Sequence, residues 1–444
     1  MTGCGRTIRA IGPPQAHAGN RMPMKTLKQG LRGTFRSLRR RNYRLFFVGH
    51  AVSVSGTWMQ RVAQDWLVLE LSGSGIALGI STALQFLPIL LFGMCGGLIV
   101  DRFDRRWLII GSQIAQAVLA LTLGYLAATG VVQLWMVYAL ALLLGLVTVI
   151  DSPARQAFLA ELVEPDDYVN AQGLNSTIHN AGRLVGPAIA GVLIGSVGVE
   201  AAFFLNAASF VAVIAALVRM DPQALHRVPR SPRGPGQVRE GLAYVWSRPV
   251  LRSTIVVVAV IGLFGQNFRV VLPLLAQDTF GQGARAYGSL IALLGLGAVL
   301  GALTSASRPA PSFRSMATGC LIFAAVTFAA AASPSLLFAF AAMVALGFVN
   351  ITLNTYGRTL LLLRSDRAMH GRVMALHALV FLGSTPIGSY TAGFVSELWG
   401  PRVGIAMGGV AALLTGLAYV RRSDESPTTP PDESAALPVE RISR

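Results

Sequence analysis

Few ionisable residues lie inside the apolar segments of this sequence, and these few are its best candidates for chemistry. Arg61 and Asp65 stand four residues apart, which places both side chains on one face of a helix. A carboxylate in apolar surroundings beside a cation could alternate between charged and neutral forms, and so bind and release a proton. A permanent ion pair within one helix is the alternative, and the spacing fits both interpretations equally.

Two further arginines, Arg183 and Arg269, also lie inside apolar segments. Each needs a carboxylate partner or an aqueous cavity, because an isolated charge in lipid is costly. Since arginine binds carboxylate and phosphate well, either could face an anionic substrate. Either could instead pair with Asp65 and hold two parts of the protein together.

A third group of charges ends one apolar run and precedes the next. The segment that begins at Gly97 carries five charges within six residues, among them Asp101, Arg102, Arg105 and Arg106. In a bilayer such a cluster is tolerated at the water boundary between two spanning helices. Its arginines predict that this turn lies on the cytoplasmic side.

The elements that must position these residues are membrane-spanning helices. The chain has 444 residues, of which 53% are hydrophobic and 13% charged, and its mean hydropathy is +0.58. This is far too apolar for a soluble protein of this size. Apolar runs of about 20 residues or more recur along the chain. They predict an all-α membrane protein with twelve spans: 44–70, 75–100, 107–129, 132–152, 174–196, 201–218, 251–275, 286–307, 314–332, 335–356, 373–397 and 402–420.

The net charge of +17 follows membrane topology rather than nucleic-acid binding. If the N-terminus is cytoplasmic, nearly all Lys and Arg outside the spans fall on the cytoplasmic side, and Arg285 and Arg402 are the exceptions. This pattern predicts a multi-pass protein of the cytoplasmic membrane with both termini inside the cell. The basic N-terminal arm could also touch anionic lipid headgroups.

Composition divides the chain into five parts. We expect a basic cytoplasmic arm at 1–43, six-helix bundles at 44–218 and 251–421, a cytoplasmic linker at 219–250, and a disordered tail at 422–444. The linker ends in a segment whose apolar residues share one helical face, which predicts a short helix on the inner membrane surface. That face consists of Val238, Leu242, Val245 and Trp246.

The two bundles resemble copies of one unit. The segment 186–198 recurs 202 residues later at 388–400, with Gly186, Ala190, Gly191 and Gly198 repeated at that offset. Transporters built from such repeats hold their substrate near the membrane midplane between the halves, and rock one half against the other.

The chain resembles major facilitator superfamily transporters over residues 40 to 425. The segment 97–106 is similar to a signature loop of that superfamily: a glycine, three apolar residues, Asp-Arg and a pair of arginines, although Asp104 stands where glycine is usual. Together with 153–156 and 183–187, it resembles the branch that holds the enterobactin exporter and macrolide efflux proteins. The resemblance implies that Asp101 faces the N-terminus of the span 373–397 and that the arginines pair with carboxylates, as a latch that closes one face. A plain solvated turn is the alternative.

The span 174–196 carries a second resemblance. Gly173, Gly182, Gly186, Pro187 and Gly191 keep the spacing of the antiporter motif of drug/proton exporters. The glycines allow a neighbouring helix to approach closely, and the proline kinks the helix. Helix packing alone is the alternative, which the partial copy at 388–400 favours.

The resemblance also implies which polar residues line the substrate cavity. In this superfamily the spans 44–70, 132–152, 251–275 and 335–356 line the cavity, which favours Trp58, Asn267, Asn350 and Asn354. Other polar or aromatic residues that could line it are Gln60, Gln85, Asn175, Gln266, Trp66, Phe86, Phe264 and Phe268.

The sequence holds no phosphate loop, nucleotide-binding turn or metal-ligand spacing, which argues against an enzyme, a resident cofactor and a metal site. We therefore predict a monomeric, proton-coupled exporter of amphipathic small molecules such as drugs, macrolides or siderophores. Its expected partners are its substrate, protons and membrane lipid. Uptake or symport on the same fold is one alternative, and a membrane sensor or accessory subunit that does not transport is another.

Overall fold

Long α-helices make up most of the described chain. The structure is a computed structural model, and it describes residues 35–226 and 237–420. The predicted tail, most of the predicted N-terminal arm and the basic part of the predicted linker lie outside the described residues.

Six long helices form the first half. They are α2 (Arg41–Ser72), α3 (Gly75–Arg102), α4 (Arg105–Ala128), α5 (Leu134–Glu161), α6 (Tyr168–Ile194) and α7 (Val199–Val218), with short helices η1 (Arg36–Arg39), η2 (Pro165–Asp167) and η3 (Pro222–Ala224). Local sequence explains where several of them begin. The Ser74 hydroxyl accepts the Ala77 N–H at the start of α3, and the Asp104 carboxylate accepts two N–H groups at the start of α4.

The second half begins with the short helix α8 (Gln237–Ser247). It continues with α9 (Pro249–Gly265), α10 (Phe268–Leu274), η4 (Leu275–Thr279), α11 (Ala284–Ala306), α12 (Phe313–Ala331), α13 (Leu336–Leu363), η5 (Arg367–Met369), α14 (His370–Gly383), α15 (Thr385–Trp399) and α16 (Pro401–Val420).

Two predicted spans of the second half are interrupted helices. The span 251–275 occurs as α9 and α10. In an uninterrupted helix the Leu263 carbonyl would accept the backbone N–H of Asn267. Here it accepts the Asn267 side chain instead, at 2.7 Å, and the helix breaks at this point. The span 373–397 occurs as α14 and α15, and Pro386, which has no N–H to continue the helix, follows the break at Ser384.

Ten helical segments of the described chain are long and apolar enough to cross a membrane. They lie in α3, α4, α5, α7, α11, α12, α13 and α16, and in the combined segments Pro249–Thr279 and Arg367–Trp399. The remaining two predicted spans coincide with α2 and α6, which are long enough but more polar. The all-α membrane fold is confirmed, and the count of twelve stays a prediction at those two helices.

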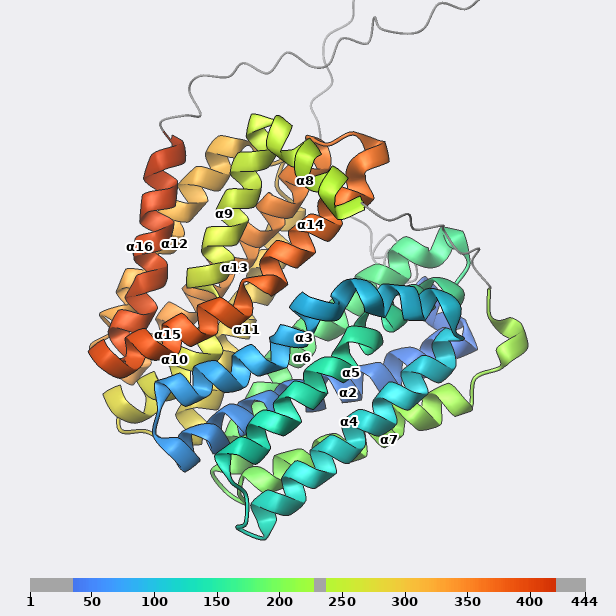
Figure 1. Ribbon diagram of the computed structural model, residues 1–444, viewed down its shortest axis with the longest axis horizontal. Helices are drawn as coiled ribbons and strands as arrows, with labels where there is room; N and C mark the ends of the chain where they lie inside the picture. Colours follow the sequence, from blue (N-terminus) through green and yellow to red (C-terminus); the bar gives the residue numbers. More distant parts are fainter. Residues whose placement is uncertain (1–34, 227–236, 421–444) are drawn as a thin grey trace, which may run out of the picture.

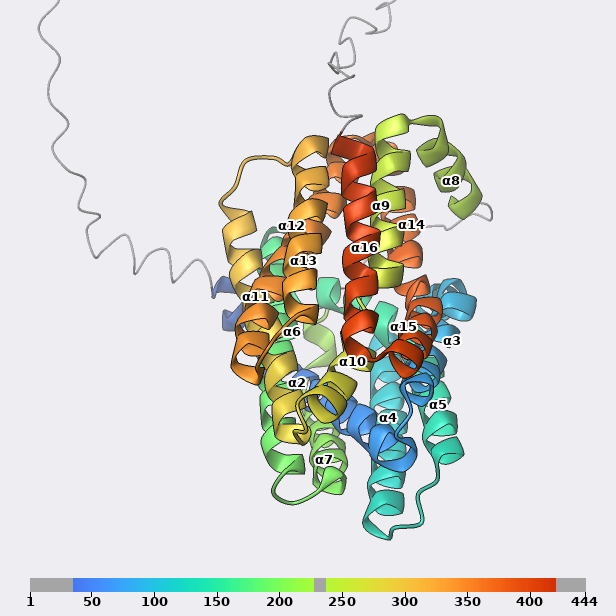
Figure 2. The same cartoon turned by 90° about the vertical axis from the view of Figure 1, so that its left-hand side faces the viewer.

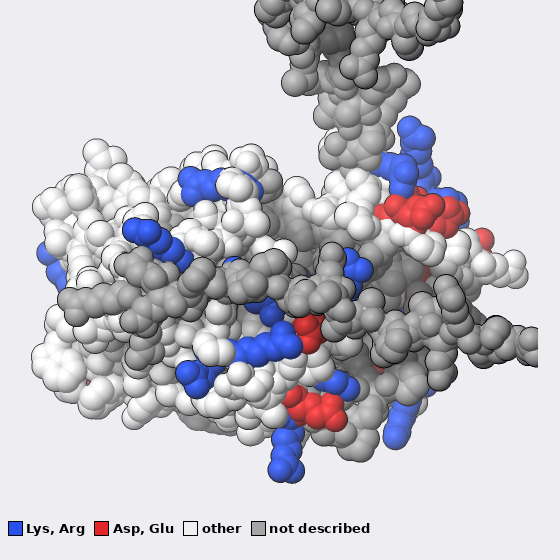
Figure 3. Space-filling model, turned by 90° about the horizontal axis from the view of Figure 1, so that it is seen from above, with Lys and Arg blue, Asp and Glu red and all other residues white. Residues whose placement is uncertain are grey.

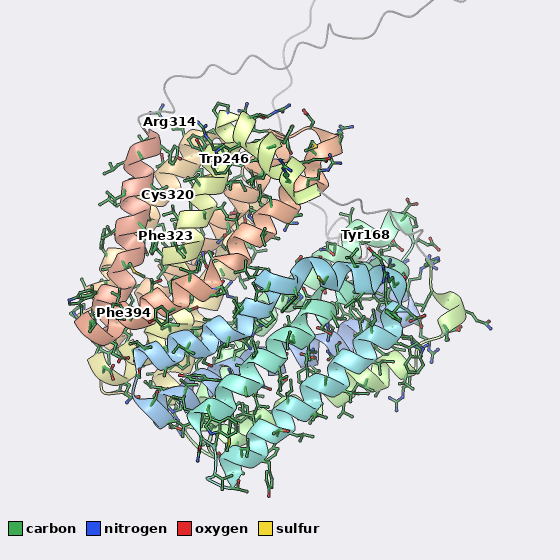
Figure 4. All side chains as sticks on the ribbon, in the orientation of Figure 1. Tyr168, Trp246, Arg314, Cys320, Phe323 and Phe394 are labelled. Carbon is green, nitrogen blue, oxygen red and sulfur yellow. The ribbon has the colours of Figure 1, made fainter. Side chains whose placement is uncertain are left out.

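The helices run between two ends of the molecule. We name the end that holds α8, the α3–α4 turn and the start of α6 the linker end, and the end that holds the α2–α3 and α15–α16 turns the distal end (Figure 1). In Figure 4, Trp246, Arg314 and Tyr168 mark the linker end and Phe394 lies toward the distal end.

The two halves touch near the distal end and diverge toward the linker end (Figure 1). Helix α3 packs on α15, and α6 packs on α11 (Figure 2). Gly393 lies against the backbone of Gly75, and Gly288 lies against Pro187 and Gly191, so closely that a Cβ on either glycine would collide with backbone atoms. Because Gly191 and Gly393 are a repeated pair, the internal repeat places equivalent glycines at the two contacts between the halves.

Helix α8 packs against the linker end of the second half. Val245 is fully buried in a cluster with residues of α9, α13 and α14, whereas Leu242 and Trp246 are about half exposed. Arg248, just after α8, pairs with Asp366 at 2.8 Å. Hydrogen bonds with the Tyr244 hydroxyl and with this guanidinium lower the pKa of the Asp366 carboxyl. Val245 of the predicted apolar face therefore packs inside the protein, whereas Leu242 and Trp246 stay exposed, and the position of α8 on a membrane surface stays a prediction.

Candidate functional site

A cavity of about 500 Å³ lies within the first half. Its wall comes from α2, α3, α4, α5 and α6, and it extends from the middle of the helices toward the linker end. Trp58, Arg61 and Gln85 stand at the middle, and Asp151 and Asn175 stand toward the linker end. The cavity is therefore closest to water on the side where the two halves diverge.

Two arginines share one aromatic side chain at the middle of the molecule. The Arg61 guanidinium lies 4.7 Å from the centre of the Trp58 ring, and that of Arg183 lies 5.6 Å from it. Such contacts favour a cation by about 0.5–2 kcal/mol but leave its charge in place. The sequence favoured four residues for the cavity wall, and Trp58 is the one of these that lines this cavity.

A polar cluster occupies the linker side of the cavity. The Asp151 carboxylate accepts hydrogen bonds from Ser112 at 2.6 Å, Gln113 at 3.1 Å and Arg155 at 2.8 Å. Arg155 also donates from Nη1 to Nδ1 of His50 at 2.9 Å. A guanidinium can only donate, so Nδ1 of His50 accepts and the ring of this neutral histidine carries its proton on Nε2.

The Asp65 carboxylate joins the two halves. Arg269 donates to it twice, from Nε to Oδ2 at 2.9 Å and from Nη2 to Oδ1 at 2.7 Å, and the Tyr287 hydroxyl donates to Oδ2 at 2.8 Å. The third arm of Arg269 donates to Oε1 of Gln85, a residue of the cavity wall, at 2.9 Å. Asp65 is 1% exposed. Its cationic partner is thus Arg269 of the other half, and not Arg61 of its own helix.

A second carboxylate ties the halves together at the distal end. Glu397 of α15 accepts the Ile76 N–H at 2.9 Å and the Ser74 hydroxyl. Both donors lie at the N-terminus of α3, Ser74 as the N-cap and Ile76 in the first turn, where the helix dipole favours an anion. Nearby, Arg285 at the start of α11 donates to the Gly195 carbonyl at the end of α6 at 3.3 Å.

The other three favoured residues, Asn267, Asn350 and Asn354, lie in the second half and outside the cavity wall. Asn350 and Gln266 exchange two hydrogen bonds at 2.7 and 3.1 Å, and Asn354 donates to Asn350 at 2.7 Å. Asn267 is engaged at the break between α9 and α10. These amides connect helices of one half, and a role in binding substrate stays a prediction.

Two arginines of the charged turn contact residues of the first half. Arg105 pairs with Glu161 at 2.6 Å, and Arg106 donates to the carbonyls of Leu217 and Val218 at 2.9 and 3.1 Å, which caps the end of α7. Gly97 is buried, Asp101 is half-buried and Arg102 is exposed. The predicted latch between the halves stays a prediction for a conformation in which the linker end is closed.

The glycine motif of α6 serves two neighbouring helices. Gly182 and Gly186 lie against α2, and a Cβ on Gly186 would collide with the backbone of Ser55. Pro187 and Gly191 lie against Gly288 of α11, across the boundary between the halves. Gly173 faces open space. Close packing thus accounts for three of the four glycines, and a role in antiport stays a prediction.

A family model described as transmembrane secretion effector matches residues 32–437. The chain belongs to this family of major facilitator transporters. It is 25% identical over 377 residues to the multidrug efflux pump Tap of Mycolicibacterium fortuitum, which covers 82% of this chain and 92% of that protein. It is also 25% identical over 251 residues to macrolide efflux protein A of Streptococcus pyogenes, which covers 54% of this chain and 60% of that protein. The chain spans about three fifths of the length of the first curated relatives it matches.

Solved structures of major facilitator proteins share the fold. A bacterial homologue of the lysosomal transporter Spinster, in an inward-facing and unoccupied conformation, matches with a TM-score of 0.65 and 17% identity, over 86% of this chain and 95% of that one. The nucleoside transporter NupG matches with a TM-score of 0.69 and 11% identity, over 88% and 99% of the two chains. The family and these relatives are membrane transporters and not enzymes, and the chain is a multi-pass membrane protein.

Several cavity residues of this major facilitator protein were not among the predicted site residues. They are His50, Gln116, Asp151, Arg155 and His179. The i, i+4 spacing of Asp151 and Arg155 suits the ion pair that the structure contains. The spacing could not predict that this pair faces a cavity, because that depends on how α5 is rotated within the bundle.

Proposed function

We propose that this major facilitator protein is a proton-coupled exporter of amphipathic small molecules that works by alternating access. The observation that carries the proposal is the Asp65–Arg269 ion pair, which joins the halves near the distal end while the cavity reaches toward the linker end. The cavity wall mixes polar with apolar residues such as Phe86 and Leu144, as an amphipathic ligand requires. The names of relatives, a multidrug efflux pump and a macrolide efflux protein, favour export.

We place the protein in the cytoplasmic membrane with the linker end in the cytoplasm. Figure 3, seen from above, has blue arginine side chains spread over this face, with Asp and Glu in fewer groups. At the distal end, Arg285 and Arg402 are accompanied by Glu70, Glu200 and Glu397. An excess of arginine on one side is the signal that orients spanning helices. The expected monomeric state and the contact of the basic arm with lipid belong to the same proposal.

Opening of the distal end would separate α2 from α10 and α11, and so remove Arg269 and Tyr287 from Asp65. A buried carboxylate without a cation is unfavourable, and a proton from the distal side would neutralise it. When the distal end closes again, Arg269 returns and displaces this proton. Gln85, which accepts from Arg269 and lines the cavity, would mark the exit of the proton toward the linker end. Substrate that leaves while the distal end is open would then move against the proton.

Proton flux in proteoliposomes tests this function. The full-length protein would be reconstituted around a pH-sensitive dye, and erythromycin, ethidium and 2-naphthoate would be added in turn as probes. At least one probe should drive a proton flux opposite to its own movement, and Asp65→Asn should abolish that flux. Asp278→Asn, which removes an exposed carboxylate outside the ion-pair network, is the matched control and should keep it.

Two outcomes would contradict the proposal. A full proton flux in Asp65→Asn would exclude Asp65 as the coupling group. Movement of proton and probe in the same direction would assign the protein to symport, the alternative on this fold.

A further inference from the structure

Arg61, for which the described residues offer no carboxylate partner, stands in the wall of the cavity. We infer that this cavity binds the anionic group of its ligand at Arg61, so that the transported compounds are amphipathic organic anions. The inference rests on the proposed function, since it names the substrate class of the same cavity.

The charge of Arg61 is not neutralised by its neighbours. Among residues 35–226 and 237–420, no carboxylate lies within ion-pair distance of Arg61. Asp65, one helical turn further on, is engaged by Arg269 and Tyr287. Arg61 contacts the face of the Trp58 ring, and Arg183 contacts the same ring. The described residues offer no ion pair to Arg183 either. An anion beside Trp58 would therefore meet two cations.

The carboxylate of the cavity wall is not available to a cationic ligand. Asp151 is the acidic residue among those that line the cavity of the described chain, and it already accepts from Ser112, Gln113 and Arg155. A cationic ligand would have to displace Arg155 to reach it. With Arg61 and Arg155 against Asp151, the wall carries a net positive charge.

Gln116 provides a second, independent indication that the cavity takes a ligand with a hydrogen-bond acceptor. This residue of α4 lines the cavity and is 7% exposed, and its Nε2 has no hydrogen-bond partner within the described part of the chain. A buried N–H group is ordinarily paired, so an unpaired donor in a cavity wall indicates a place for a ligand oxygen. Arg61 and Gln116 both line the cavity and both donate, and a carboxylate is an acceptor that suits either of them.

The remaining side chains of the cavity wall indicate what the ligand carries besides its anionic group. Phe86, Ile89, Leu144 and Val54 give the cavity an apolar surface next to the Trp58 ring. A ligand that fills about 500 Å³ therefore needs an apolar or aromatic body in addition to its charged group. An aromatic carboxylate is the simplest compound with both parts.

Three probes with the same ring test the charge preference. Binding of 2-naphthoate, 2-naphthamide and 2-naphthylmethylamine, which carry one negative charge, no charge and one positive charge, would be measured by calorimetry on the full-length protein in nanodiscs. We expect naphthoate to bind at least about tenfold more tightly than either other probe, because hydrogen bonds to a charged group are the stronger ones.

Variants separate the two donors. Arg61→Gln should remove the preference for naphthoate over naphthamide, and Arg61→Lys should keep part of it. Gln116→Leu should weaken naphthoate and naphthamide alike, by about three- to tenfold, since both present an oxygen. Arg308→Gln, the same change of charge at an exposed residue of the second half, is the control and should leave all three affinities unchanged.

A preference for naphthylmethylamine, an unchanged preference for naphthoate in Arg61→Gln, or failure of all three probes to bind would overturn the inference. Binding requires no turnover, so this result is independent of the test by proton flux. A protein that prefers naphthoate but produces no proton flux contradicts the proposed function alone. One that exports a probe against protons but prefers the cation contradicts this inference alone.

Discussion

Asp65 lies where two possible cations compete for it. Arg61 is one turn away on the same helix, but the two guanidinium hydrogen bonds to the Asp65 carboxylate come from Arg269 on the opposite half. A bidentate arginine–carboxylate pair is held in a fixed geometry, whereas an i, i+4 pair contributes a few tenths of a kcal/mol. The pair across the boundary therefore dominates the energetics of this carboxylate.

A double-mutant cycle measures which arginine is coupled to Asp65. Arg269→Gln should lower the free energy of unfolding by about 3–5 kcal/mol, because it leaves a buried carboxylate without its cation. Adding Asp65→Asn to that variant should recover much of the loss. The matched cycle with Arg61→Gln should give a coupling energy below about 1 kcal/mol. Unfolding by SDS in mixed micelles supplies the four free energies of each cycle, and a larger coupling to Arg61 would contradict the assignment.

Sequence reasoning reached part of this site. The scarcity of charged residues in apolar segments was enough to select Arg61, Asp65, Arg183 and Arg269, and pairing of Asp65 with one of the distant arginines was one of two predicted possibilities. The choice between Arg183 and Arg269 was beyond the sequence, because it depends on which helices meet across the boundary. Asn350 and Asn354 lie outside this cavity because in this conformation their amides bond within the second half, and their role in binding substrate stays a prediction.

Helix contacts in this protein depend on glycine at a few positions. Gly288 and Gly393 hold the closest approaches between the halves, α11 on α6 and α15 on α3. These contacts replace side-chain packing by contact between backbones, which is a common way for helices to associate in a membrane. Any side chain there would push the distal ends apart.

Alanine substitutions distinguish glycines that pack against another helix from glycines that face open space. Gly288→Ala should destabilise the protein by about 1–3 kcal/mol, since the new methyl would lie 2.6 Å from the Pro187 carbonyl oxygen and from Cα of Gly191. Gly173→Ala, in the same predicted motif as Gly191 but facing open space, should be neutral or slightly stabilising. Thermal unfolding of the purified variants compares the two. Equal losses in both would show that the motif matters through something other than this contact.

Apolar runs predicted the helices well but not their interruptions. The predicted 107–129 and 402–420 differ from α4 and α16 by at most two residues at either end, because the change from polar to apolar composition is sharp there. The predicted 132–152 falls short of α5, which continues to Glu161 through polar residues. The break at Asn267 had no signal in the sequence, because its cause is a side-chain hydrogen bond that forms only in the folded helix.

We interpret the two halves, their distal contacts and the cavity as one state of the proposed alternating-access cycle. In this state the glycine contacts and the Asp65 and Glu397 bonds close the distal end, and the cavity reaches toward the linker end. In this state Arg105 and Arg106 contact residues of the first half, and the proposed latch at the charged turn would belong to the opposite state. A change that weakens the distal contacts should therefore shift the population, and need not unfold the protein.

Reciprocal labelling of two cysteines tests this shift. In a variant with Cys4, Cys95 and Cys320 replaced, Ala284→Cys would report on the distal contact, where Ala284 is 5% exposed, and Asn175→Cys on the cavity. Asp65→Asn removes the charge that Arg269 binds, and each 1.4 kcal/mol lost from the closed distal end changes the ratio of states about tenfold. Labelling by a soluble maleimide should thus become faster at position 284 and slower at position 175, whereas Asp278→Asn should change neither. Faster labelling at both positions would indicate general loosening, and would contradict two alternating states linked through Asp65.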